Sequence, residues 1–340
     1  MKIRVLGGGW YGCTIAFELL RDGHDVELHE IGEGLFQGAS GANPARLHLG
    51  FHYPRSGATM AACLEHQAEF IDKFGHLTVP VPVNIYAVAA ADSLVDYRQY
   101  IDTFRNRVQF IEIDPEEFGL RHVEGAVLTG ERHIVIDTAR NWFSQVLAGH
   151  VKFGKDPGVV DDPAWSMTID CTFCANDEQN IDRFEPCVTG LLLGPVNRAV
   201  TIMDGQFGSI YPWNEGMGLS SLTSAKFTPL SRTCRTKAEA DAVLAATSPD
   251  ELLNQCAKML LQMSHYWPAA MDVYRIAGYR TGVRAMPKSA ADSRLVDVVR
   301  VGERALRVRA GKIDAVFHAA RTIRNQIRES RSIIRQAVVH

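Results

Sequence analysis

The sequence predicts an α/β fold in which a doubly wound parallel domain is joined to a second domain made of an antiparallel sheet and helices. Three observations support this prediction: a strand, glycine turn, helix and strand open the chain, strand-like alternation fills its middle, and a long helical pattern closes it. The chain has 340 residues, of which 46% are hydrophobic. This is enough for two domains with full cores and excludes disordered and fibrous proteins.

The glycine turn near the start of the chain predicts a dinucleotide site. Residues 2–6 have a strand pattern, residues 11–21 a helical one and residues 25–29 a second strand pattern. In the intervening G-x-G-x-x-G turn, the first glycine permits the bend, the second lets the backbone approach a pyrophosphate, and the third lets the helix pack closely. An acidic residue after the second strand can accept a hydrogen bond from a ribose hydroxyl. The predicted cofactor contacts in this unit are Gly7, Gly9, Trp10, Tyr11, Gly12 and Glu30.

The later elements predict that the nucleotide domain is discontinuous. Helical spacing recurs at residues 58–74, 94–105, 138–147 and 249–266, and strand patterns occupy residues 83–89 and 199–227. We therefore assign residues 1–75, 131–175 and 276–340 to the nucleotide domain and residues 76–130 and 176–275 to the second, substrate domain.

Composition narrows the class of protein further. No run approaches the roughly 20 apolar residues that cross a bilayer, and the glycines interrupt the apolar start, so we expect a cytoplasmic protein without a membrane partner. Seven scattered cysteines are typical of reduced thiols. Cys171 and Cys174 form a C-x-x-C pair without two further ligands at zinc-site spacing, so no metal site is predicted.

Four segments resemble, in order, segments of the FAD-dependent D-amino-acid oxidase superfamily, which includes glycine oxidase, sarcosine oxidase and L-2-hydroxyglutarate oxidase. Residues 37–53 resemble its flavin-contacting loop, and residues 136–138 resemble the V-D-P segment that opens a helix. Residues 282–284 (G-V-R) resemble its G-x-R-P segment, and residues 311–314 (G-K-I-D) resemble the glycine turn before its last helix.

The resemblance implies a Rossmann-type FAD-binding domain and FAD as the cofactor. A helix N-terminus at the glycine turn would stabilise the negative charge of a reduced flavin. The further cofactor contacts that the resemblance implies are Ser40, Asn43, Arg46, Leu47, His48, Gly311, Lys312 and Ile313.

Three residues are the predicted catalytic set. By the resemblance, Arg284 binds a substrate carboxylate, for which a guanidinium offers two parallel hydrogen bonds; a surface arginine paired with Asp292 is the alternative. Tyr211 matches an aromatic position that faces the substrate, with a core tyrosine as the alternative. His52 lies in the flavin loop, where its ring is expected to contact the flavin.

The resemblance also implies the reaction, in which a carbon bearing an amine or a hydroxyl gives a hydride to the flavin and O2 is the expected electron acceptor. The first hypothesis is oxidation of the C–N bond of an amino acid or N-substituted glycine to an imine that hydrolyses. An FAD-dependent 2-hydroxy-acid oxidase or dehydrogenase is the second, favoured by the likeness of residues 47–54 to the L-2-hydroxyglutarate oxidase loop. A non-catalytic nucleic-acid-binding flavoprotein is the third.

The last helical segment carries a basic stripe. Residues 294–340 contain 11 basic and 4 acidic residues, although the whole chain has a net charge of −3. Arginines at helical spacing predict phosphate contacts along nucleic acid, and a solvated face is the alternative. A relative of this superfamily acts on a glycine-like group of a tRNA uridine, so a glycine-modified nucleobase in RNA or DNA joins the candidate substrates. The stripe consists of Arg321, Arg324, Arg328, Arg331 and Arg335.

Overall fold

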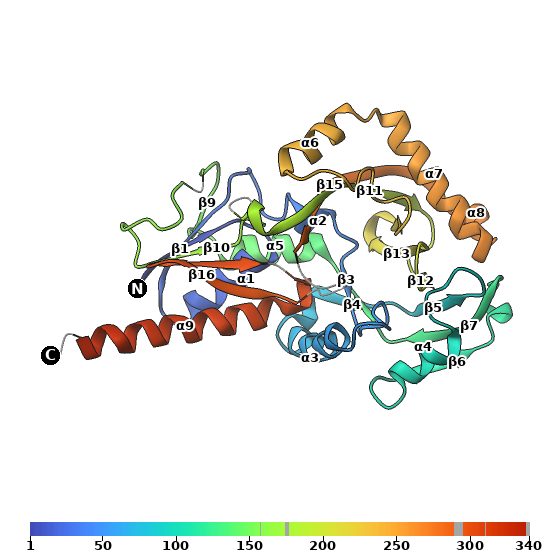
Figure 1. The fold of residues 1–340 in the computed structure, drawn as a ribbon, viewed down its shortest axis with the longest axis horizontal. Helices are drawn as coiled ribbons and strands as arrows, with labels where there is room; N and C mark the ends of the chain where they lie inside the picture. Colours follow the sequence, from blue (N-terminus) through green and yellow to red (C-terminus); the bar gives the residue numbers. More distant parts are fainter. Residues whose placement is uncertain (157, 174–176, 289–294, 310, 338–340) are drawn as a thin grey trace.

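The structure is a computed structural model that describes residues 1–156, 158–173, 177–288, 295–309 and 311–337, and only the backbone of residues 287 and 330–337. Two large sheets divide the molecule (Figure 1). A six-stranded sheet lies beside the N-terminus and the last helix, and an eight-stranded sheet lies at the other end, with a small three-stranded sheet between them.

The six-stranded sheet has the parallel centre that the sequence predicts. Its strand at the glycine turn, β1, pairs in parallel with neighbours on both sides, and only the outermost pair, β16 with β17, is antiparallel. The predicted strand, helix and strand of the first 29 residues are confirmed. In spatial order the strands are β16 (Asp297–Gly302), β17 (Ala305–Arg309), β10 (Met167–Asp170), β1 (Lys2–Leu6), β2 (Asp25–His29) and β9 (Val151–Lys152).

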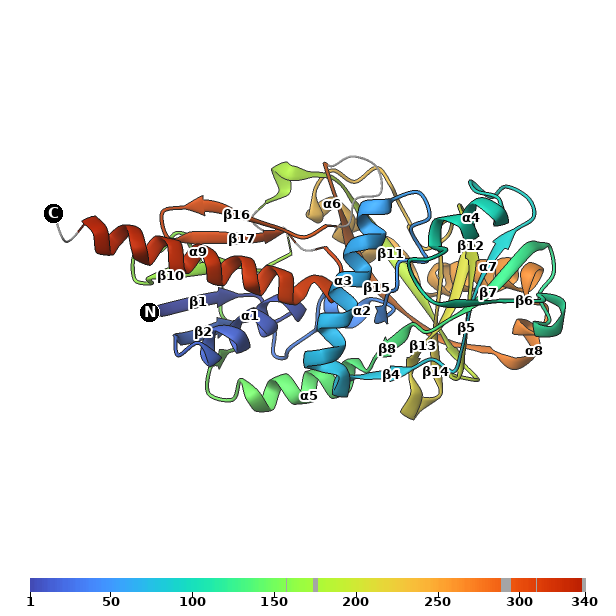
Figure 2. The ribbon, with the colours of Figure 1, turned by 90° about the horizontal axis from the view of Figure 1, so that it is seen from below.

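Helices cover one face of this sheet, and their apolar side chains share one core with it. The last helix contributes Ile323 and Ile327, which are buried at a spacing of four residues because that spacing keeps them on one helical face. This helix packs against α1, and Figure 2 shows α3 crossing near its first turns. The helices of this layer are α1 (Trp10–Arg21), α3 (Gly57–Phe74), α5 (Ile136–Val146) and α9 (Val316–Ala337).

The eight-stranded sheet is antiparallel except where β5 pairs in parallel with β12. Its outer face packs against α7 (Pro249–Tyr266), with α6 (Lys237–Ala246) and α8 (Ala270–Val273) on the same side (Figure 1). Tyr100 and Phe104 of α4 (Tyr97–Phe104) are buried against the other face. In order the strands are β15 (Arg275–Pro287), β11 (Ile181–Leu193), β14 (Leu219–Ser224), β13 (Gly208–Asn214), β12 (Arg198–Met203), β5 (Val83–Ala89), β7 (Val123–Thr129) and β6 (Phe110–Ile113).

The small sheet consists of β3 (Arg46–Leu47), β8 (Arg132–Ile134) and β4 (Thr78–Pro80), and the single turn α2 (Ala39–Ala42) precedes it. The predicted domain boundary at residue 276 falls at the start of β15, and this strand pairs along its length with β11 in the larger sheet. The six described cysteines are free thiols. Within the described residues, no helix has both the length and the hydrophobicity to span a membrane.

Candidate active site

The glycine turn between β1 and α1 is tightly packed. Gly7 has a φ of +95°, a left-handed conformation that favours glycine, and a Cβ on Gly12 would lie 1.9 Å from the Gly7 carbonyl oxygen. The first turn of α1 therefore packs directly on the loop that precedes it. A dinucleotide site needs this close approach, because the pyrophosphate lies on the helix N-terminus.

Two polar side chains border this turn. The Ser40 hydroxyl accepts a hydrogen bond from the Trp10 N–H at 3.0 Å, at the start of α1. The carboxylate of Glu30 accepts from the backbone N–H groups of Gly8 at 2.6 Å and Gly32 at 2.7 Å. The N-terminus of α1, with the Ser40 hydroxyl beside it, fits the pyrophosphate of FAD. The Glu30 carboxylate, at the end of β2, fits the ribose.

Tyr11 connects the two segments of the chain that were predicted to contact the cofactor. Its hydroxyl donates to the Lys312 carbonyl at 2.6 Å and accepts from the Gly311 N–H at 3.2 Å. The Lys312 ammonium lies 3.2 Å from the Cys63 sulfur and 4.2 Å from the centre of the Tyr53 ring. Burial alone would lower the pKa of Lys312, but these neighbours and a nearby carboxylate raise it, so the amine stays charged. Ile313, next in the turn, packs against the core.

The loop that resembles the flavin-contacting loop is fixed by Asn43. Its side-chain amide donates to the Ala39 carbonyl at 2.9 Å, and its amide oxygen accepts from the Ala45 N–H at 2.7 Å. Leu47 is fully buried in the core. The His48 side chain is largely buried, with 17% of it exposed, and its desolvation, followed by the charge of Lys312, holds its pKa well below the usual range.

A cavity of about 490 Å³ lies between this loop and the eight-stranded sheet. The register of the sheet builds its polar wall, because Thr201 of β12 pairs with Ser209 of β13 on one side and with Tyr86 of β5 on the other. Alternate residues point to the same face, so these three polar side chains lie side by side while their apolar neighbours pack under α7. His52, from the loop, also lines the cavity, and its Nδ1 lies 2.7 Å from the Tyr86 oxygen.

Arg46 reaches this wall from β3 and is buried there. Its guanidinium donates to the hydroxyls of Tyr86 at 3.0 Å, Thr201 at 2.9 Å and Ser209 at 2.7 Å, and it lies 3.9 Å from the centre of the Tyr211 ring. Burial alone would lower the pKa of Arg46, but the nearby tyrosines and a buried glutamate raise it. The guanidinium therefore places a permanent positive charge behind the cavity.

Glu131 supplies the negative charge that balances Arg46. This carboxylate, in the turn between β7 and β8, is fully buried. It accepts from the Tyr86 hydroxyl at 2.7 Å and from the Leu49 N–H at 2.8 Å. The Tyr86 oxygen also lies 2.7 Å from Nδ1 of His52, so the four side chains form one hydrogen-bonded network beside the cavity.

Comparison with known proteins agrees with this geometry. The family described as FAD dependent oxidoreductase (DAO) matches residues 2–141. The FAD-dependent monooxygenase FPY4 of Fusarium mangiferae is 35% identical over 332 residues, which cover 94% of this chain and 89% of that protein. This chain belongs to the family of FAD-dependent oxidoreductases. The oxidoreductase is thus an enzyme whose cofactor is FAD, as the resemblance of its four segments implied.

Other relatives and solved structures support the same assignment. The FAD-dependent monooxygenase kojA of Aspergillus flavus is 35% identical over 153 residues, 43% of this chain and 36% of that protein. Glycine oxidase of Bacillus cereus superposes with a TM-score of 0.67 at 11% identity, covering 93% of this chain and 90% of that one. Iminodiacetate oxidase of Chelativorans sp. gives 0.64 at 10% identity, with 92% and 91% covered. These structures share the fold, and the predicted FAD-binding domain with an antiparallel substrate domain is confirmed.

Two of the predicted catalytic residues of the oxidoreductase already have partners within the protein. Arg284 lines the cavity, and its guanidinium pairs with Glu185, which faces it directly across β11 and β15. Asp292, the alternative partner, lies outside the described residues. Tyr211 is buried beneath Arg46, donates to the Arg132 carbonyl at 2.9 Å and is not among the cavity-lining residues. Substrate contact by either residue stays a prediction.

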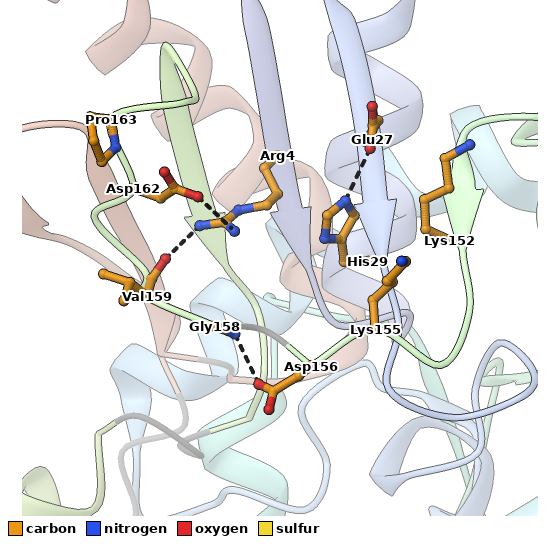
Figure 3. Close-up of a pocket in the computed structure, with 10 residues that line it drawn as sticks. All are labelled: Arg4, Glu27, His29, Lys152, Lys155, Asp156, Gly158, Val159, Asp162 and Pro163. Atoms are coloured by element: carbon orange, nitrogen blue, oxygen red, sulfur yellow. Dashed lines mark hydrogen bonds and ion pairs between the residues drawn. The ribbon is translucent and has the colours of Figure 1, made fainter.

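A second, more open pocket of about 690 Å³ lies on the face of the six-stranded sheet opposite α1 (Figure 3). It contains none of the predicted site residues of the oxidoreductase. Several of its charged side chains pair with one another or with the backbone: Arg4 donates to the Val159 carbonyl at 2.6 Å and lies 3.4 Å from Asp162, and His29 lies 3.1 Å from Glu27. These contacts are typical of a charged sheet face covered by a loop.

The basic stripe lies on α9, as predicted, and part of it is used to hold that helix in place. Arg321 pairs with Glu69 of α3 at 2.5 Å, and Arg324 donates twice to Asp22 at 2.6 Å, beyond the end of α1. Arg328 is exposed. The side chains of Arg331 and Arg335, and Cys174 of the C-x-x-C pair, lie outside the described residues.

The sequence analysis did not identify four residues of the cavity wall and its hydrogen-bonded network. These residues are Tyr86, Thr201, Ser209 and Glu131. A signal for two of them exists in the sequence. Thr201 and Ser209 interrupt otherwise apolar strands at the alternate positions that face away from α7. Polar residues at such positions indicate a face that meets a site rather than a core.

Proposed function

We propose that this oxidoreductase oxidises a small carboxylate at the carbon that bears an amino or a hydroxyl group. The observation that carries this proposal is the cavity wall, where His52 lies beside the charged Arg46 and the hydroxyl groups of Thr201 and Ser209. FAD, when bound, supplies the acceptor for the hydride. The chain itself supplies the binding, the orientation and the proton transfer.

In the first version of the proposal, the substrate is an amino acid or an N-substituted glycine, and oxidation of its C–N bond gives an imine that water hydrolyses. The shared fold with proteins named glycine oxidase and iminodiacetate oxidase supports this version. Arg284 would hold the substrate carboxylate. Its Nε donates to Glu185 at 2.9 Å, and the side chain lines the cavity and is 44% exposed, so part of the guanidinium is accessible to a ligand.

The charge of the cavity favours a second version, in which the substrate is a 2-hydroxy acid. Among the described lining residues the one carboxylate is Asp204, and it pairs with Arg55 at 2.6 Å. Arg46 and Lys312 are both cationic and near His52. A substrate ammonium would find no counter-ion on this described wall, whereas a hydroxyl and a carboxylate suit it.

We propose O2 as the electron acceptor. The relatives named monooxygenases support a reaction with oxygen, and they raise the question of where its atoms go. An oxidase releases one peroxide for each O2 consumed, whereas a monooxygenase puts one oxygen atom into its product. Parallel measurement of O2 uptake and peroxide release during turnover separates the two.

Binding of nucleic acid stays a prediction, and it rests on the exposed part of the basic stripe of α9, which includes Arg328. Arg321 and Arg324 are engaged with carboxylates of α3 and of the α1 end, which lowers the charge that they offer to phosphates. A free small molecule is therefore the substrate that we propose.

Anaerobic bleaching of the flavin tests the proposed function. The purified holoenzyme is mixed without oxygen with glycine, sarcosine, D-amino acids, 2-hydroxy acids and glycine-modified nucleosides, and the flavin absorbance is followed. We expect bleaching by amino acids in the first version and by 2-hydroxy acids in the second. A flavin that dithionite bleaches but no member of the panel does would refute both versions.

A further inference from the structure

The hydrogen bonds around Tyr86 determine which nitrogen of His52 carries a proton. A tyrosine hydroxyl has a single hydrogen, and the Glu131 carboxylate, 2.7 Å away, can only accept it. The Tyr86 oxygen must then act as the acceptor toward Nδ1 of His52, also at 2.7 Å. Nδ1 therefore carries the hydrogen of the neutral ring, and Nε2 has the free electron pair.

The contact with Arg46 does not change this assignment. Nη1 of Arg46 has two hydrogens, and its nearer acceptors are the hydroxyls of Tyr86 at 3.0 Å and Thr201 at 2.9 Å. The same Nη1 lies 3.4 Å from both ring nitrogens of His52, so it favours neither. Burial, and then the charges of Arg46 and Lys312, hold the pKa of His52 well below its usual range, so the ring is uncharged near neutral pH.

From this geometry we infer that His52 is the general base of the proposed oxidation, with Nε2 as the atom that takes the substrate proton and with Tyr86 and Glu131 as positioning residues. This inference rests on the proposed function and deepens it. The substrate N–H or O–H bond breaks, its proton forms a new bond to Nε2, and its electron pair becomes the second bond of C=N or C=O. FAD, when bound, would supply the acceptor for the hydride of the carbon that bears this nitrogen or oxygen, so two electrons and two hydrogens are removed from the substrate in all.

The network also explains how the ring holds the proton that it gains. A protonated His52 would carry a positive charge next to Arg46, which disfavours it. Glu131 offsets this charge through Tyr86, as the carboxylate of a hydrogen-bonded triad does for its histidine. Burial and the positive charges of Arg46 and Lys312 keep the proton affinity of Nε2 low, so the ring releases the proton readily before the next turnover.

Nuclear magnetic resonance of the holoenzyme tests the tautomer without any substrate. The protein is labelled with 15N-histidine, and His52→Gln identifies the His52 signals among those of the 12 histidines. We expect a neutral ring with the proton on Nδ1 throughout the range from about pH 6 to about pH 9, although an ordinary histidine titrates near 6.5. A proton on Nε2, or a doubly protonated ring at neutral pH, would overturn the inference.

Tyr86→Phe tests the positioning role in the same experiment. It removes the acceptor for Nδ1 while keeping the ring that packs in the core. We expect His52 to lose its single tautomer and show a mixture, with the flavin absorbance kept as the check on folding. An unchanged Nδ1 tautomer in Tyr86→Phe would show that Tyr86 and Glu131 do not position the ring.

Flavin reduction tests the base itself. With a substrate from the panel, His52→Gln should slow anaerobic reduction by about 10²-fold to 10⁴-fold and change its pH dependence, while dithionite still bleaches the flavin. His265→Gln, at the end of α7, is the matched control and should reduce at the wild-type rate. Equal rates in wild type and His52→Gln would refute the base and leave the proposed function standing. Failure of every substrate on wild type would refute the proposed function and the base with it, while the tautomer result still decides whether Tyr86 and Glu131 position the His52 ring.

Discussion

Replacing Arg324 separates two roles for the basic stripe of α9. Its guanidinium donates twice to Asp22 at 2.6 Å and once to Glu18 at 3.1 Å. The Arg324 side chain is 27% exposed and that of Glu18 only 4%, so the pair is more buried than a surface ion pair. We expect Arg324→Gln to weaken the docking of α9 on α1.

The magnitude follows from this geometry. An exposed ion pair contributes about 0.2–1 kcal/mol and a hydrogen bond to a charged group about 1.5–3 kcal/mol. Arg21 also lies 3.2 Å from Glu18, so Glu18 keeps one cation after the change. The free energy of unfolding should therefore fall by about 1–2 kcal/mol, between these limits.

Urea unfolding of the FAD-loaded protein measures this loss, with Arg328→Gln as the matched control, because Arg328 lies one turn further along α9 and is exposed. The control should unfold at the wild-type midpoint, and the difference between the variants should shrink in high salt. Equal midpoints for the two variants would refute the docking role.

The nucleic-acid role is measured on the same proteins. Filter binding of RNA at two salt concentrations should show negligible retention if the stripe only docks α9. Strong retention that falls when Arg324, Arg328 and Arg331 together become Gln would instead support phosphate contacts, each worth up to about 0.9 log units of affinity per log unit of salt on a duplex.

Three further predictions concern the cofactor site, acid stability and substrate binding. Gly12→Ala should give colourless protein, because its Cβ would lie 1.9 Å from a turn carbonyl, whereas Gly57→Ala, with nothing within 4 Å, should keep full flavin absorbance. Burial would raise the pKa of Asp177, but hydrogen bonds from Arg309 and a nearby asparagine outweigh it and lower the pKa. This carboxylate therefore stabilises the fold at neutral pH and loses that effect below about pH 4, so Asp177→Asn should flatten the fall of the urea midpoint in acid. Arg284→Ala should raise the KM of a carboxylate substrate about tenfold, equal to about 1.4 kcal/mol, and an unchanged KM in steady-state kinetics would place the carboxylate contact elsewhere.

The cofactor half of the molecule could be predicted because its signals are local. The glycine spacing and the alternation of apolar residues lie within the first 29 residues, and each reports on neighbours a few positions away. The strands β1 and β2 accordingly have the predicted bounds.

The cavity wall could not be predicted in the same way, because it depends on pairing between distant strands. Arg46 was assigned to the cofactor loop, and its guanidinium bonds Thr201 and Ser209, which lie 155 and 163 residues further along the chain. The partner of Arg284 is likewise set by the register of β11 against β15, which no local pattern encodes. The stripe on α9 was found from its spacing, but the carboxylates that face it belong to other elements of the fold.

The hydrogen bonds of Tyr11 have a consequence for biosynthesis. Its hydroxyl bonds Gly311 and Lys312, which lie 300 and 301 positions further along the chain and form the turn that leads into α9. A ribosome adds about 5–20 residues per second, so the first strand and helix wait many seconds for that turn to emerge. During this interval the side of α1 that later receives Ile323 and Ile327 is an open apolar surface. The nascent chain should therefore need chaperone protection until this turn has been synthesised, and flavin uptake should follow its docking on α1.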